Sequence, residues 1–277
     1  MKIGRHLALV VALSLIFFGK TFAAGGEPAD VGAAKKREAG GSPVTTERLL
    51  IGTDDTSGWV MYGGNYGNWR YSPLSDINKK NVGKLAPVWM FQTGVPGGQF
   101  ANSPIVVDGV MYVSAPFNNL WALDAATGPM LWHYEHEGAR DVALCCGPGN
   151  RGVAIKGDLI YMATLDAKLL AIERSNGEIR WASQMDDYKK GYSATSAPLI
   201  VGDIVISGIA GGEYGVRGFI SAYDATTGKK LWKQYTVPAA GEPGSESWAG
   251  DSWKTGGGPT WSTGTYDPET NLVYWGV

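Results

Sequence analysis

The stretch LWALDAATGPMLW, residues 120–132, occurs three times in this chain without gaps, because LLAIERSNGEIRW (169–181) and ISAYDATTGKKLW (220–232) align with it position by position. Every copy has Ala at its third position, Gly at its ninth and Trp at its thirteenth. The tryptophans Trp132 and Trp181 are 49 residues apart, and Trp181 and Trp232 are 51 apart. A period of this length is typical of repeat architectures, in which each repeat is one supersecondary unit.

Each repeat also contains the signals of several short strands. Upstream of each copy, two apolar runs flank a turn at Asp108-Gly109, Gly157-Asp158 or Gly202-Asp203. Counting these runs, one unit has about four strands joined by tight turns. We therefore predict an all-β fold, a β-propeller of four-stranded blades. A β-sandwich with coincidental tryptophans does not explain three ungapped matches.

Composition supports a turn-rich β protein and excludes other classes. The chain has 40 Gly among 277 residues, about 14%, with 44% apolar and 18% charged residues. Glycine at this level without a three-residue period excludes collagen, and the apolar content excludes disorder. The net charge is −2 and no basic stripe occurs, so the chain lacks the positive charge that binds nucleic-acid phosphates. We expect no nucleic-acid partner.

The N-terminus has the pattern of a secretory signal. Lys2 and Arg5 precede an apolar run at residues 7–18, which is too short to span a bilayer, and the small residues Ala23 and Ala24 follow. We therefore expect a signal peptide at residues 1–24, export, and no stable membrane insertion. Residues 25–48 combine glycine, alanine and charge without an apolar period, which predicts a flexible linker. Folded structure is expected from residue 49 onward.

The first and third copies have the pattern A-x-D-x-x-T-G-x-x-x-W, and the second has Glu173 and Asn176 in place of its Asp and Thr. This pattern resembles the tryptophan-docking motif of the quinoprotein dehydrogenases. The best-known members of that superfamily are eight-bladed propellers that bind pyrroloquinoline quinone (PQQ). A similar repeat occurs in cofactor-free propellers, including an outer-membrane assembly lipoprotein. The motif thus indicates the fold more than the function, and a periplasmic protein-binding scaffold remains the alternative.

Two adjacent cysteines add a more specific signal. Cys145 and Cys146 are the chain's only cysteines, and from their type alone they could be free buried thiols, an intermolecular bridge or a strained vicinal disulfide. Followed by Asn150-Arg151-Gly152, they resemble the C-C-D-x-V-N-R-G signature of PQQ-dependent methanol and ethanol dehydrogenases. This resemblance implies a Cys145–Cys146 disulfide over one face of PQQ and an Arg151 that pairs with a cofactor carboxylate. Gly147-Pro148-Gly149 departs from the family pattern.

An insertion in the third repeat carries a second resemblance. Six extra residues enter that unit, and residues 210–218 resemble the G-x-E-x-G-V-R-G stretch of the same dehydrogenases. The resemblance implies that Glu213 ligates Ca²⁺, or a lanthanide, and that Gly211 and Gly212 contact PQQ. In isolation, Glu213 would be a surface residue in a Gly-rich turn.

Two further positions match the family by resemblance. Thr195 occupies the place of a threonine that hydrogen-bonds the cofactor, and Trp261 that of the tryptophan stacked on the PQQ face opposite the disulfide. Trp261 lies outside the repeat register, whereas a core tryptophan would lie within it. Residues 98–104 (GQFANSP) lack the Glu that relatives commonly carry there, and no role is assigned to Gln99.

Other chemistries find little support. His133 and His136 follow a docking tryptophan, and we expect both on a solvated turn. The pair Asp186-Asp187 is interpreted as a polar loop. No H-E-x-x-H, C-x-x-C-H, P-loop or G-x-S-x-G pattern occurs.

The resemblance implies the N-terminal part of a periplasmic PQQ- and metal-dependent dehydrogenase. Such an enzyme oxidises a primary alcohol to the aldehyde and passes electrons to an acceptor such as cytochrome c. The 229 residues from 49 to 277 hold only four to five units, about half of an eight-bladed ring. We expect the catalytic base to lie beyond residue 277, so no catalytic residue is assigned and the piece itself is expected to be inactive.

Overall fold

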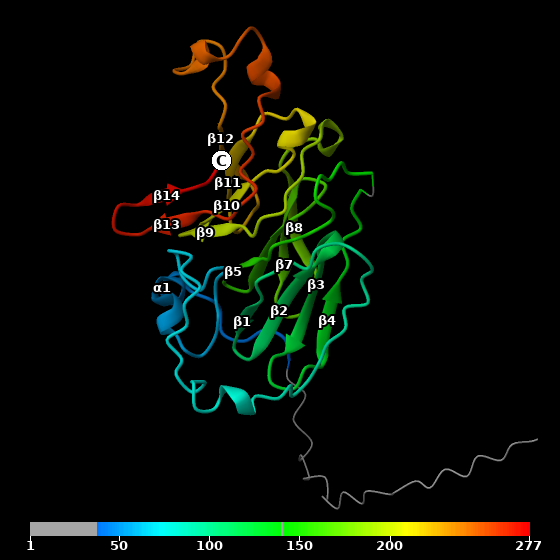
Figure 1. Cartoon of the computed structure of the whole chain (residues 1–277), viewed down its shortest axis with the longest axis vertical. Coiled ribbons are helices and arrows are strands. Elements are labelled where there is room, and N and C mark those ends of the chain that lie inside the picture. Colours follow the sequence, from blue (N-terminus) through cyan, green and yellow to red (C-terminus); the bar gives the residue numbers. More distant parts are fainter. Residues whose placement is uncertain (1–37, 140) are drawn as a thin grey trace, which may run out of the picture. The chain divides into compact units, whose positions relative to one another are not determined.

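The computed structural model describes residues 38–139 and 141–277; the expected signal peptide and the first part of the expected linker lie outside this range. Three four-stranded antiparallel sheets, each ordered as a meander, and one two-stranded hairpin follow along the described chain (Figure 1). This is the architecture of propeller blades, and it confirms the predicted fold class. The first sheet comprises β1 (Ile105–Val107), β2 (Val110–Ala115), β3 (Asn119–Asp124) and β4 (Met130–Tyr134); the second comprises β5 (Ala154–Lys156), β6 (Leu159–Ala163), β7 (Lys168–Glu173) and β8 (Ile179–Gln184). The third comprises β9 (Leu199–Val201), β10 (Ile204–Gly208), β11 (Phe219–Asp224) and β12 (Lys230–Tyr235), and the hairpin is β13 (Thr265–Asp267) with β14 (Leu272–Tyr274).

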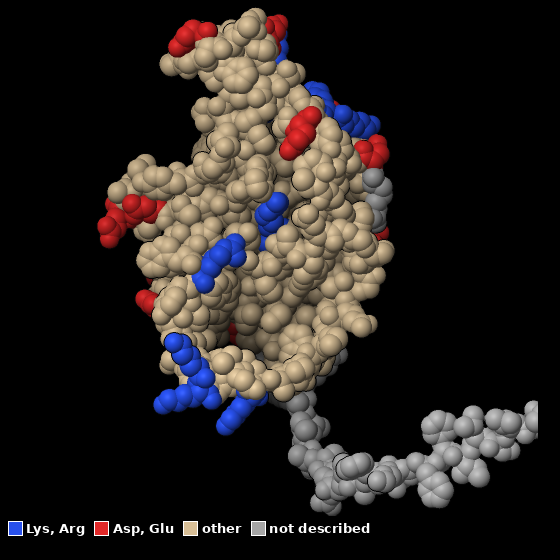
Figure 2. Space-filling model, in the orientation of Figure 1, with Lys and Arg blue, Asp and Glu red and all other residues tan. Residues whose placement is uncertain are grey.

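Helical structure is limited to short segments among the described residues. The helix α1 spans Thr46–Ile51. The 3₁₀ turns are Gly52–Asp54, Val82–Lys84, Pro116–Asn118, Tyr188–Lys190, Gly212–Tyr214, Ser245–Ser247 and Ser252–Thr255. None of the helices in the described part of the chain is long and apolar enough to cross a bilayer. On the face that Figure 2 shows, charged side chains are scattered singly or in small groups over a largely uncharged surface.

The repeated alanine has a packing role in the middle of each sheet. Ala122 is fully buried on β3 and lies opposite Tyr112 of β2 on one side and Trp132 of β4 on the other. Ala171 occupies the same place between Tyr161 and Trp181. A small side chain is needed there because two large rings flank it. The register shifts directly after this alanine in all three sheets, so the three repeats share an irregularity between their third and fourth strands.

The repeated glycine is where one sheet docks on the next. In the turn after β7, Gly177 has a φ of +79°, and a Cβ there would lie 2.8 Å from the Trp132 ring of the preceding sheet. The Trp132 indole N–H donates to the Arg174 carbonyl of the same turn at 2.8 Å. Trp181 docks on Gly228 in the same way. The prediction that these tryptophans pack on the neighbouring unit is therefore confirmed for Trp132 and Trp181.

One further tryptophan docks in the same way before the first sheet, whereas the tryptophan of the third repeat is the most exposed of the three repeat tryptophans. Trp89, which the repeat alignment did not include, lies against Gly128 and donates its indole N–H to the Ala125 carbonyl at 3.3 Å. It thus docks on the first sheet as Trp132 docks on the second. Trp232 of β12 is 42% exposed.

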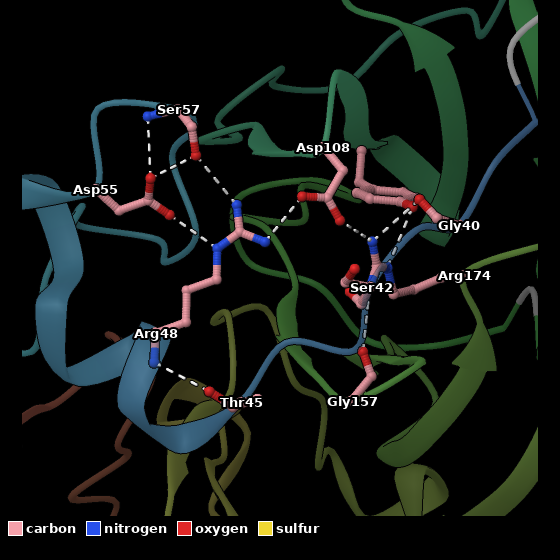
Figure 3. A network of polar contacts seen from close by, with 10 residues as sticks. Gly40, Ser42, Thr45, Arg48, Asp55, Ser57, Asp108, Gly157 and Arg174 are labelled. Carbon is pink, nitrogen blue, oxygen red and sulfur yellow. Dashed lines mark hydrogen bonds and ion pairs between the residues drawn. The ribbon is translucent and has the colours of Figure 1, made fainter.

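The end of the segment expected to be a linker is packed against the sheets, which corrects that expectation for residues 38–48. Val44 is buried and pairs with Gly157 in an antiparallel bridge. Arg48 of α1 binds Asp55 at 2.8 Å and Asp108 at 2.9 Å, and Asp108 also contacts the buried Arg174 (Figure 3). A sequence window cannot reveal the contacts of Val44 with Gly157 and of Arg48 with Asp108, because these partners lie at least 60 residues downstream.

His136 does not lie on a solvated turn as expected. Its ring is buried between the first two sheets, with Nε2 2.8 Å from the Asp166 carboxylate and Nδ1 2.9 Å from the Tyr134 hydroxyl. Asp166, in the turn between β6 and β7, also accepts hydrogen bonds from Thr164 and Lys168. His133 is exposed as expected, but it lies on β4 rather than on a turn, and its ring stacks on Trp121 of β3. The His136–Asp166 pair therefore links the first sheet to the second.

Candidate functional site

A cavity of about 290 Å³ lies where loops from different sheets meet. The loop before β5 contributes one wall, the loop before β9 and the insertion between β10 and β11 contribute the next, and the segment after β12 closes it. Seven of the eight predicted site residues line this cavity: Cys145, Cys146, Arg151, Thr195, Gly211, Glu213 and Trp261. Gly212 is the exception, although it is adjacent to two lining residues. Residues predicted from four separate stretches of sequence thus surround one space.

Arg151 lines the cavity and is held by two neighbours. Its Nη1 donates to the Thr195 hydroxyl at 2.7 Å, and its guanidinium carbon lies 4.8 Å from the centre of the Trp261 ring. The Thr195 backbone carbonyl also accepts a hydrogen bond from the Arg151 backbone N–H at 3.0 Å. One side-chain donor is therefore engaged, and the planar fork keeps further N–H groups for an anionic ligand.

Trp261 has surroundings unlike those of the docking tryptophans. Its side chain is 47% exposed, compared with 9% for Trp132. The preceding Pro259 and Thr260 are fixed against the insertion and β11, because Thr260 is buried and its hydroxyl donates to the Phe219 carbonyl. An exposed indole on a fixed backbone offers a flat apolar surface to a planar ligand.

Cys145 and Cys146 are adjacent exposed thiols with sulfur atoms 3.0 Å apart. The hydrogen bond to Cys146, partial desolvation and the negative charge of Glu213 raise the pKa of Cys145 to about 11. Cys145 is therefore a neutral thiol at pH 7 rather than a reactive thiolate. The influence of Glu213 also shows that the metal candidate and the cysteine pair share the same corner of the cavity.

Glycines shape the loop that carries Glu213. Gly211 has a φ of +109°, and a Cβ on it would lie 2.0 Å from the Gly191 carbonyl oxygen. A Cβ on Gly212 would lie 2.8 Å from Pro259. Neither position can accept a larger residue without moving the backbone, so Glu213 projects from a turn that is tightly packed against two other segments.

Some lining residues were not assigned from the sequence. Tyr214 follows Glu213 directly and lines the cavity, as do Gln99 and Ser193. The signal that could have found Tyr214 is an aromatic residue inside the Gly-rich insertion. Gln99 comes from the stretch that lacks a carboxylate, and the structure brings it to the cavity nonetheless.

The lining suits the cofactor that the sequence resemblance implies, but it supplies only part of a metal site. A flat aromatic surface, a guanidinium and backbone free of side chains at Gly211 match a planar polycarboxylate. Glu213 is the one carboxylate among the described lining residues. The described part of the chain holds no group of three or more His, Cys, Asp or Glu that could bind a metal ion. Because Ca²⁺ takes six to eight oxygens, its other ligands would come from the cofactor and from groups other than these.

Comparison with known proteins agrees with this geometry. Residues 59–277 match the family model described as PQQ: glucose/ethanol/alcohol dehydrogenase, beta-propeller domain. The quinoprotein alcohol dehydrogenase PedH of Pseudomonas putida is 40% identical over 253 residues, which are 84% of this chain and 42% of that protein. A lanthanide-dependent methanol dehydrogenase of Methylacidiphilum fumariolicum is 39% identical over 242 residues, covering 79% of this chain and 39% of that one.

A solved structure gives the same result in three dimensions. The structure of a europium-containing methanol dehydrogenase matches with a TM-score of 0.76 at 36% identity, covering 82% of this chain and 43% of that chain. The chain spans about two fifths of the length of the curated relatives just described. The family match extends over most of the chain, from the residues before the first sheet to the last hairpin. The chain therefore belongs to the PQQ family of glucose, ethanol and alcohol dehydrogenase β-propellers.

Proposed function

We propose that this protein is a periplasmic PQQ- and metal-dependent dehydrogenase that oxidises a primary alcohol to the aldehyde and passes the electrons to an external acceptor such as cytochrome c. The observation that carries the proposal is the gathering of Arg151, Thr195, Glu213 and Trp261 with the cysteine pair around one cavity. A cofactor-free scaffold has no requirement for an exposed indole beside a guanidinium and a carboxylate at this place.

The described residues would hold the cofactor in distinct ways. Arg151 would bind a carboxylate through its free N–H groups, while Thr195 donates or accepts a hydrogen bond beside it. Trp261 would support one face of the ring, and Cys145 and Cys146 would cover the other. Gly211 and Gly212 would let the backbone approach the ring edge. When bound, PQQ supplies a quinone that accepts two electrons, which is chemistry no side chain provides.

Glu213 is the proposed ligand for the metal, either Ca²⁺ or a lanthanide. A carboxylate at the cavity wall provides hard oxygen atoms, which both ions prefer. Two of the relatives described above are a lanthanide-dependent and a europium-containing methanol dehydrogenase, which supports considering a lanthanide beside Ca²⁺. Loading with each ion in turn would separate them.

We also propose that Cys145 and Cys146 form a disulfide in the exported protein. Their sulfurs already lie 3.0 Å apart, and no other cysteine is present in the chain. Joining the thiols releases two protons and two electrons, which an oxidising compartment accepts through its thiol-oxidising proteins. Mass spectrometry of protein exported from cells, alkylated before and after reduction, would detect the bond as a loss of two mass units.

The central test is titration of the full-length protein with PQQ in the presence of Ca²⁺, followed by quinone absorbance. Arg151→Ala should weaken binding by about 10- to 100-fold, because it removes a charge-assisted hydrogen-bond partner. Arg180→Ala is the matched control, since Arg180 is exposed on β8 and pairs with Glu173 away from the cavity lining. Glu213→Gln should abolish the dependence of binding on the metal, while Glu178→Gln in a surface turn should not.

The same titration can reject the proposal. If the wild-type protein binds no PQQ with either ion, the protein-binding scaffold becomes the better interpretation. If Arg180→Ala weakens binding as much as Arg151→Ala, the cofactor does not occupy this cavity.

A further inference from the structure

Asn150 is a fully buried polar residue directly before Arg151, and its amide ties the cavity loop to two sheets. Its Oδ1 accepts hydrogen bonds from the Ser114 hydroxyl of β2 at 2.8 Å and from the Gly152 backbone N–H at 2.9 Å. Its Nδ2 donates to the Ala163 carbonyl at the end of β6 at 3.1 Å. One side chain thus links the first sheet, the second sheet and its own loop.

The contacts of Asn150 extend under the cavity. Ser114 is fully buried and accepts a hydrogen bond from Asn102 Nδ2 at 3.1 Å, while its carbonyl accepts another from the same amide at 2.7 Å. Asn102 follows Ala101, which lines the cavity. The result is a chain of buried and partly buried hydrogen bonds from the residue after Ala101 to the residue that precedes Arg151. With its Oδ1 accepting two hydrogen bonds and its Nδ2 donating one, the buried Asn150 amide has a single favoured orientation.

The backbone of Arg151 is fixed between these contacts. Its N–H donates to the Thr195 carbonyl and its own carbonyl accepts from Ser103 N–H at 3.1 Å. Asn150 determines the path of the chain on one side of Arg151, and the bond from Gly152 N–H to Asn150 determines it on the other. The orientation of the Arg151 guanidinium toward Thr195 and Trp261 therefore depends on Asn150, which does not line the cavity.

We propose that Asn150 is a positioning residue that orients the Arg151 guanidinium for recognition of a ligand carboxylate. The proposal rests on the proposed function in naming PQQ as the ligand. Its physical basis is that charged recognition is sensitive to displacements of less than 1 Å, and that supporting hydrogen bonds hold a binding group in place. Loss of the amide should then remove carboxylate recognition while leaving the other contacts of the cavity in place.

A matched control exists because Asn118 donates to the same Ala163 carbonyl, at 3.3 Å. Asn118 is also buried, and its Oδ1 accepts the Leu165 N–H at 2.9 Å. It has no contact with Arg151 or Gly152 among the interactions of the described residues. Asn150→Asp and Asn118→Asp thus both remove one donor to Ala163 and both bury a carboxyl group. Asn150→Ala adds a neutral variant, which separates loss of the amide from gain of a charge.

The experiment compares binding of PQQ with binding of its trimethyl ester, which has the same ring but no carboxylates. In the wild type the acid should bind about 10- to 100-fold more tightly through Arg151, and Arg151→Ala defines how much of this preference that side chain supplies. Asn150→Ala and Asn150→Asp should lose most of the preference that Arg151 supplies. The ratio of ester to acid dissociation constants in these variants should be within about 3-fold of the ratio in Arg151→Ala. Asn118→Asp should keep the preference. A merely structural defect would weaken the acid and the ester equally.

A measurement without ligand keeps this inference separate from the proposed function. The fluorescence of Trp261, taken as the difference between each protein and its Trp261→Phe derivative, reports the Arg151 contact. Asn150→Ala should give the difference spectrum of Arg151→Ala, and Asn118→Asp that of the wild type. If wild-type protein binds no PQQ, the proposed function fails while this signal still tests Asn150. The inference is overturned if Asn150→Ala retains the wild-type Trp261 signal or the wild-type preference for the acid.

Discussion

The seam between neighbouring sheets and the wall of the cavity are both built from tryptophan, glycine and arginine, but they expose these residues to different degrees. At the seam, Trp132 is 9% exposed, covers Gly177 and donates its indole N–H to the Arg174 carbonyl. At the wall, Trp261 is 47% exposed and lies beside the guanidinium of Arg151.

The difference concerns where each polar group finds its partner. Arg174 at the seam is buried, and its guanidinium is bound by the backbone carbonyls of Gly40, Ser42 and Gly157 and by Asp108 (Figure 3). Arg151 at the wall has one side-chain donor engaged, by Thr195. Satisfied and buried groups stabilise the fold, whereas exposed and partly satisfied groups are available to a ligand. Substitutions at the seam should therefore change stability, and substitutions at the wall should change binding.

The largest effect is expected from Asp166→Asn at the seam. The carboxylate is 2% exposed; burial alone would raise its pKa, but hydrogen bonds from His136, Lys168 and Thr164 hold the pKa of Asp166 well below its usual range. Breaking such a buried pair costs about 3 to 5 kcal/mol, which denaturant titration at pH 7 would measure. Asp251→Asn is the control, since its pair with Lys254 is exposed and should change stability by less than about 0.5 kcal/mol.

The sign of the pH dependence follows from the same depressed pKa. A carboxyl group whose folded pKa lies below its unfolded pKa stabilises the protein above the unfolded value, near pH 4, and this contribution is lost as pH falls toward the folded pKa. Wild-type stability should thus fall more steeply below pH 4 than that of Asp166→Asn. If the free energy of unfolding depends on pH in the same way in both proteins, the charge of Asp166 does not stabilise the contact between the first two sheets.

The next effect is expected from Gly177→Ala, also at the seam. The φ of +79° costs an alanine about 1 to 2 kcal/mol, and the new Cβ would lie 2.8 Å from the Trp132 ring. Together these should lower the free energy of unfolding by about 3 kcal/mol. Gly202→Ala separates the two causes, because Gly202 has a φ of +56° but no atom within 4 Å of the new Cβ. Gly202→Ala should cost about 1 kcal/mol, and equal losses would mean that docking adds nothing.

The seam could be predicted from the sequence to the extent that its determinants are local. The acidic residue before the turn (Asp124, Glu173 or Asp224), the Gly with positive φ and the Trp that follows recur within thirteen residues, so alignment reveals them. Trp89 was missed because the turn motif does not precede it, although it docks on Gly128 like the others. The contact of His136 with Asp166, and that of Val44 with Gly157, join residues 30 or more positions apart that no repeat links.

The cavity wall could be predicted only where a family signature names its residues. Spacing alone located the insertion at residues 210–218, because it breaks the repeat, but it could not show that Glu213 lies near Cys145. That proximity arises from the stacking of the second sheet on the third. Gln99, which precedes the first sheet, and Tyr214, in the insertion of the third, also line the cavity. Asn150 belongs to the signature, but the positioning role proposed for it depends on its hydrogen-bond partners on β2 and β6, which the sequence does not show.

The smallest effects are expected from two substitutions of the same type, and they test the comparison most directly. Trp132→Phe removes the N–H that satisfies the buried Arg174 carbonyl and should cost about 1 to 2 kcal/mol in unfolding free energy, with PQQ affinity unchanged. Trp261→Phe removes part of an exposed ring and should change unfolding free energy by less than about 0.5 kcal/mol. Its PQQ dissociation constant should rise about 3- to 10-fold, because a smaller aromatic surface remains for stacking. Each protein thus serves as the control for the other, with denaturant titration and PQQ titration as the two measurements. A Trp261→Phe protein that loses stability and binds PQQ normally would place Trp261 with the seam and remove the flat surface on which the proposed cofactor site depends.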